Sequence, residues 1–118
     1  MSRQAHTDAD FADTAKLFKA LAHPLRVKII CGLLEEPCTQ TRIAACLGVP
    51  QSSVAQHLDV LRRAGIVEGN RFGTEVTLAI GDVRVPRVLR AACRSGGSIP
   101  LFAWEAAGRP RSRRTRPV

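Results

Sequence analysis

Apolar side chains recur at helical spacing over the first half of this chain and then switch to the alternation of a strand. Between residues 8 and 64 they return every three or four positions, and Pro24, Pro37 and Gly48 interrupt the pattern. Over residues 75–80 the period is two, because Val, Leu and Ile alternate with Thr and Ala. A single change of period in this direction predicts a mainly α domain that carries a small β-hairpin.

Local start and stop signals divide the chain into elements. The expected helices are residues 8–21 behind the cap Thr7, a buried helix from Pro24 to the Glu35-Glu36-Pro37 stop, a short helix between Thr39 and Gly48, residues 51–64, and a last helix capped by Asp82. Ile66-Val67 and residues 75–80 predict the two strands of the hairpin. Residues 69–73 predict its turn, with Arg71 at a basic tip.

The helices and the hairpin together predict one folded domain over residues 8–94. Residues 1–7 are expected to be a flexible N-terminus, residues 95–107 a linker with a short C-terminal segment, and residues 108–118 a disordered Arg-rich tail. Of 18 Lys and Arg against 10 Asp and Glu, five arginines fall in the last ten residues. This basic balance favours nucleic acid over a membrane surface as the partner, and a merely solubilising tail is the alternative.

Several classes of protein do not fit the sequence. No apolar run approaches the ~20 residues that span a bilayer, and the polar N-terminus does not resemble a signal peptide, so a cytoplasmic protein without a membrane partner is expected. In that compartment the four cysteines are expected to be reduced. The chain lacks a Ser/His/Asp pattern, a Gly-rich phosphate loop and Cys-x-x-Cys. Neither an enzyme nor a cofactor is therefore expected.

The helix over residues 51–64 has two chemically different faces. Small hydrogen-bonding side chains gather near its start, and they are Gln51, Ser52, Ser53 and Gln56. The opposite face carries Val54, Leu58 and Leu61. A helix that enters the DNA major groove needs this combination, and the preceding short helix and following hairpin complete a winged helix-turn-helix. For the helix alone a solvated surface face is the preferred interpretation, and the neighbouring helix and hairpin favour groove binding instead.

The stretches LFKALAHPLRVKII (17–30) and RIAACLGVPQSSVAQHLDVLRRAGIVEG (42–69), with the hairpin to Ile80, resemble the ArsR/SmtB family of bacterial repressors. The resemblance implies a homodimer formed by the first and last helices. It also implies that the dimer binds a palindromic operator in double-stranded DNA through residues 51–64 and the wing over 66–80, until an inducer releases it. The family's DNA-contacting positions fall on Gln51, Ser52, Ser53 and Gln56, with His57 and Arg71 as further candidates for contacts to phosphate.

Two inducer sites known in this family lack their ligands here. The Cys-x-Cys pair of the arsenic type corresponds to Thr39 and Thr41. The last-helix site of the zinc type keeps Asp82, but its next positions hold Arg84, Ser95 and Ser98. Whether any metal binds is therefore left unknown by the sequence.

Cysteines are the remaining candidates for sensing. Cys31 matches the position of a cysteine in the redox- and persulfide-responsive branch of the family, and its candidate partners are Cys93 and Cys38. The same three thiols suit a soft ion such as As(III) or Cu(I). Burial as small apolar side chains is the third reading, and it is preferred for Cys46. A winged-helix module that binds protein instead of DNA is the rival function.

Overall fold

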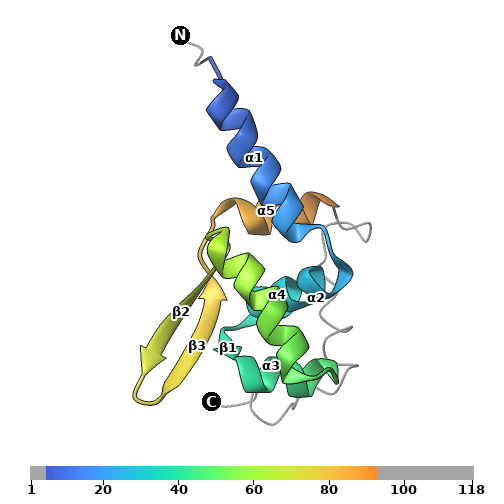
Figure 1. Ribbon diagram of the computed structural model, residues 1–118, viewed down its shortest axis with the longest axis vertical. Helices are drawn as coiled ribbons and strands as arrows, with labels where there is room; N and C mark the ends of the chain where they lie inside the picture. Colours follow the sequence, from blue (N-terminus) through green and yellow to red (C-terminus); the bar gives the residue numbers. More distant parts are fainter. Residues whose placement is uncertain (1–4, 93–118) are drawn as a thin grey trace.

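The computed structural model describes residues 5–92 and arranges them as a helical body with a projecting hairpin (Figure 1). In chain order the elements are α1 (Asp8–Leu21), α2 (Pro24–Glu35), β1 (Cys38–Thr39), α3 (Gln40–Leu47), α4 (Gln51–Arg63), β2 (Val67–Phe72), β3 (Glu75–Ile80) and α5 (Arg84–Ala92). The sequence prediction of a mainly α winged helix-turn-helix is confirmed. Cys93, the predicted linker over 95–107 and the predicted tail over 108–118 lie outside the described residues.

The helix boundaries follow from capping chemistry. Thr7 and Asp10 form a reciprocal capping box at the start of α1. His23 caps α2 through its Nδ1, which accepts from the backbone N–H of Leu25 at 3.0 Å. Gly48 has a φ of 68° after α3, a left-handed conformation that glycine adopts without a side-chain clash. This turn sets α3 and α4 as the two helices of the helix-turn-helix.

The core is one apolar cluster with α2 at its centre. Ile29 and Ile30 of α2 are fully buried, as are Ile43 of α3 and Leu61 of α4. Burying a side chain of this size contributes about 1.5–3 kcal/mol relative to leaving it in water. The core therefore fixes the orientation of α4, whose opposite face remains open.

The hairpin differs from its prediction in two respects. A short strand, β1, was missed, and it pairs with β3 to give a three-stranded antiparallel sheet in the order β1-β3-β2. The first strand also continues to Phe72, because residues 69–72 pair with 75–78 instead of forming a turn. The turn itself is Gly73-Thr74, in which Gly73 has a φ of 65°, as a two-residue hairpin requires of its first residue.

Helix α1 rises from the body (Figure 1). It also carries two exposed aromatic side chains. Phe11 is 61% exposed and Phe18 is 52% exposed, whereas Leu17 and Leu21 of the same helix are buried. The i, i+7 spacing of the two phenylalanines places them on one stripe of the helix. None of the helices in the described part of the chain is long and apolar enough to cross a membrane.

Candidate nucleic-acid interface

The exposed face of α4 presents the polar side chains that the sequence singled out. Gln51, Ser52 and Gln56 are exposed and Ser53 is half-buried. On the opposite side Val54, Leu58 and Leu61 belong to the buried core. The structure thus brings the four predicted residues together on one rigid helix, with their hydrogen-bonding groups open to a ligand.

The N-terminus of α4 adds backbone donors to this face. Pro50 occupies the N-cap position and provides no side-chain hydrogen bond. The backbone N–H groups of Ser53 and Val54 bond back to the carbonyl of Pro50, so the donors that face a ligand are those of Gln51 and Ser52. The first-turn donors of such an uncapped helix, together with its dipole, favour an anionic group such as phosphate.

The wing carries one basic side chain, Arg71. Its partner on β3, Val76, lines the same groove as Gln51 at the start of α4. Arg71 is exposed on β2, directly opposite Val76 on β3. It therefore lies within the strand, one residue before the tip residue Phe72, which is 67% exposed. The turn is flanked by Phe72 and Glu75, so the prediction that Arg71 makes the tip of the hairpin basic is wrong. Glu68 also lies on the wing. Arg71 alone supplies positive charge there.

A groove that the sequence did not reveal joins the start of α3, the start of α4 and the wing. It has a volume of about 550 Å³ and its lining residues are Thr39, Gln40, Thr41, Arg42, Ala45, Gln51, Thr74, Glu75 and Val76. Gln40 and Thr41 therefore extend the polar surface of α4 toward the hairpin. The run of polar residues after Cys38 could have indicated Gln40 and Thr41 as surface residues of this groove, but only the helix cap Thr39 was predicted from it.

His57, predicted to contact phosphate, already contacts two other side chains of the protein. Its ring lies 4.3 Å from the ring of His23, and Nη1 of Arg26 is 3.3 Å from its Nδ1. Partial burial, followed by the positive charges of His23 and Arg26, lowers the pKa of His57. A neutral, packed imidazole is a weak partner for phosphate, so this contact stays a prediction.

Asp82, which matches one ligand position of the family's zinc site, is held by an arginine. Both oxygens of Asp82 accept from the Arg84 guanidinium, at 3.0 and 2.7 Å, and Oδ1 also accepts from the Arg84 backbone N–H. These bonds lower the pKa of Asp82 and raise that of Arg84. Arg84 also reaches Asp13 of α1 at 3.2 Å. A fixed side-chain cation thus lies beside the carboxylate that matches the family's zinc ligand.

The described cysteines lie in the core. Cys31 is 4% exposed, Cys38 is 6% exposed and Cys46 is fully buried. Within residues 5–92, no group of three His, Cys, Asp or Glu side chains is placed to hold a metal ion. A three-thiolate site would therefore depend on Cys93.

Comparison with known proteins gives the family context of this geometry. The family described as "Bacterial regulatory protein, arsR family" matches residues 23–69. The regulator CmtR of Mycobacterium tuberculosis is 39% identical over 75 residues, which are 64% of each chain. The repressor PagR of Bacillus anthracis is 35% identical, over 66% of this chain and 79% of PagR. The chain spans just under two thirds of the length of CmtR, and 61% of the repressor SmtB of M. tuberculosis.

Solved structures agree with these matches. The crystal structure of PagR has a TM-score of 0.69 and 32% identity, and the match covers 74% of this chain and all of PagR. The homodimeric winged helix-turn-helix DNA-binding domain of Mb0332 from Mycobacterium bovis has a TM-score of 0.65 and 28% identity, over 75% of this chain and 82% of that one.

Proposed function

Because the chain belongs to the ArsR family of bacterial regulatory proteins, we propose that it is a dimeric repressor that reads a palindromic DNA operator through α4 and the wing. The relatives named above are transcriptional regulators, and the family consists of DNA-binding regulators, not enzymes. Double-stranded DNA and a second copy of the chain are the partners in this proposal.

The observation that carries the proposal is the division of α4 into a buried and an open face. Val54, Leu58 and Leu61 fix the helix on the body, while Gln51 and Gln56 point away from the core. A glutamine side chain forms a bidentate pair with an adenine edge in the major groove, and such a pair discriminates by about 1–3 kcal/mol. The uncapped first turn of α4 and Arg71 of the wing would contact phosphates on either side.

The aromatic face of α1 supports the dimer in this proposal. Phe11 and Phe18 are more than half exposed, and large aromatic side chains are enriched at the centres of protein interfaces. Two copies of one helix-turn-helix read half-sites about 34–36 Å apart, which matches one turn of the double helix. An isologous contact through α1 and α5 would set this spacing.

The experiment exchanges Gln51 and Gln56 for alanine together and measures affinity for the upstream region of the protein's own gene. The double variant is expected to bind this DNA about 30- to 25,000-fold more weakly, because two base contacts of about 1–3 kcal/mol each are lost. Val83→Ala, which shortens an 84% exposed side chain outside the helices, serves as the control and is expected to bind normally. Unchanged DNA affinity in the double variant, with dimerisation intact, would favour the protein-binding module instead.

Release from DNA is proposed to depend on the thiols of Cys31 and Cys93, with Cys38 as the other candidate partner. A polysulfide or disulfide would accept two electrons as the two thiols lose their protons and form a bridge. Since Cys31 and Cys38 are almost fully buried, an oxidant reaches them only when the surrounding packing opens. A soft ion such as As(III) or Cu(I) held by the same cysteines is the alternative inducer.

The thiol proposal is tested by treating the full chain with polysulfide, disulfide or As(III) and measuring DNA affinity and intact mass. Oxidant is expected to weaken DNA binding, and Cys31→Ser and Cys93→Ser are each expected to bind DNA normally without being released. Release by As(III) alone would establish the soft-ion alternative. Normal release of both variants by oxidant would overturn the thiol switch.

A further inference from the structure

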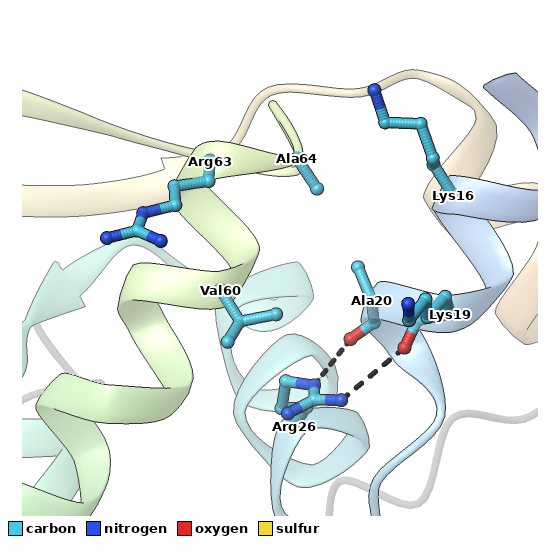
Figure 2. A pocket seen from close by; sticks show the side chains of 7 residues that line it. All are labelled: Lys16, Lys19, Ala20, Arg26, Val60, Arg63 and Ala64. Carbon is cyan, nitrogen blue, oxygen red and sulfur yellow. Dashed lines mark hydrogen bonds between the residues drawn. The ribbon is translucent and has the colours of Figure 1, made fainter.

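A cationic pocket lies between α1, the start of α2 and the second half of α4 (Figure 2). Its volume is about 480 Å³, within the usual range for small-molecule sites. The lining residues are Lys16, Lys19, Ala20, Arg26, Val60, Arg63 and Ala64. Four of these side chains are cationic and none is acidic, so the pocket concentrates positive charge at a junction of three helices.

Arg26 forms a fixed positive floor for the pocket. Its Nε donates to the carbonyl of Ala20 and its Nη2 donates to the carbonyl of Lys19 at 3.4 Å (Figure 2). On the other side, its Nη1 lies 3.3 Å from Nδ1 of His57. These contacts orient the guanidinium before any ligand arrives, which reduces the entropy lost on binding. Among the described residues, no carboxylate bonds to Arg26, so these contacts do not neutralise the charge of its guanidinium.

Apolar side chains separate the charges. Ala20, Val60 and Ala64 point into the space between α1 and α4 (Figure 2). Val60 is 39% exposed although the adjacent Leu61 is fully buried. Because two of the three are alanines, they leave room beside the cations. A hydrocarbon group could cover this surface.

The two ends of the pocket rim differ in how available their charges are. The Lys16 side chain extends over the rim, whereas the Arg63 guanidinium turns away from the space (Figure 2). Arg63 lies 3.1 Å from Asp59, and both side chains are largely exposed. Exposed pairs of this kind contribute little, so Arg63 can exchange its partner at little cost.

Charge argues against occupation by this chain itself. Residues 93–118 contain six arginines and a single acidic residue, Glu105, so the segment is repelled by the pocket. A two-fold contact between copies of the pocket would bring like charges together. The pocket is also separate from the polar start of α4. Gln51 lies about 18 Å along the helix from Arg63, since an α-helix rises 1.5 Å per residue.

We propose that this pocket binds a small organic anion. Its carboxylate or phosphate would be held by Arg26 with Lys16 and Lys19, and its short hydrocarbon part would lie on Val60 and Ala64. The occupant would contact both α1 and α4. The proposal is independent of DNA binding and goes beyond the proposed repressor function.

The test uses the full chain without DNA and measures binding by calorimetry and by amide chemical shifts of α1 and α4. Octanoate is the probe, 1-octanol removes the charge, and inorganic phosphate removes the hydrocarbon. Octanoate is expected to bind saturably and at least about tenfold more tightly than either comparison compound. Absence of saturable octanoate binding up to about 10 mM, or equal binding of octanol, would overturn the proposal.

Variants locate the site. Lys16→Gln with Lys19→Gln is expected to weaken octanoate binding about tenfold or more. The control removes the same charge from exposed positions elsewhere, through Lys28→Gln with Arg87→Gln, and is expected to bind within about twofold of the natural chain. Val60→Glu, at a half-exposed position, is expected to abolish binding without unfolding the protein. Equal losses in the control pair, or full binding in Val60→Glu, would contradict the assignment.

Discussion

Helices α1 and α4 both bury one face and leave the other open, but the chemistry of their open faces is opposite. On α1 the open face carries Phe11 and Phe18, and on α4 it carries Gln51 and Gln56. Removing an aromatic face from water is favourable in itself, whereas a glutamine gains from burial only when it finds hydrogen-bond partners. The comparison indicates that α1 is built to meet an apolar surface and α4 to meet a patterned polar one.

The largest expected effect concerns the buried face of α4. Leu61→Ala is expected to lower the free energy of unfolding by about 2–5 kcal/mol, because it leaves a cavity where a fully buried side chain stood. Gln56→Ala on the open face is expected to change it by less than about 0.5 kcal/mol. Urea denaturation measures both. Similar losses in the two variants would mean that the open face is not free for a ligand.

The second effect concerns the aromatic face of α1 and the self-association of the chain. Phe11→Ser with Phe18→Ser is expected to weaken self-association by about 2 kcal/mol or more, or about 30-fold, because interface aromatics contribute most to binding. Sedimentation equilibrium measures the change. Phe72→Ser removes an equally exposed aromatic side chain from the wing and is expected to leave association unchanged. If only the wing variant dissociated, the assignment of the dimer surface to α1 would be wrong.

The third and smallest effect concerns His57, which lies on α4 between the two faces. Its pKa is lowered below the ordinary value of 6.5, so the unfolded chain takes up a proton that the folded protein resists. The stabilisation that His57 contributes is therefore fully present above pH 6.5 and is lost as the pH falls below that value. His57→Asn is expected to flatten this decline in denaturation series from pH 7.5 to 5.5. His6→Asn, at an exposed position, is the control, and an unchanged slope in His57→Asn would contradict the explanation.

The parts of the fold that could be predicted are those set by local chemistry. Thr7, Pro24 and Gly48 mark helix ends through their own side chains or backbone freedom, and the structure places the ends there. The apolar stripe of α4 follows from helical period alone.

The parts that could not be predicted depend on contacts between distant residues. Strand β1 has two residues, and it forms only because Cys38 lies opposite Leu78. Residues 69–72 have turn-like composition, yet pairing with β3 holds them in a strand. The packing of His57 against His23 likewise joins two helices, and no sequence spacing announces it.

Selection of duplexes from a random pool with the full chain tests whether α4 reads DNA sequence. An inverted repeat whose half-sites lie about 10–10.5 base pairs apart, or a multiple of this, is expected to be enriched, and the enrichment is expected to be lost in the Gln51→Ala, Gln56→Ala variant. Specific binding is expected to exceed binding to unrelated DNA by about 10³-fold or more. A pool without enrichment, bound equally by both proteins, would contradict the claim.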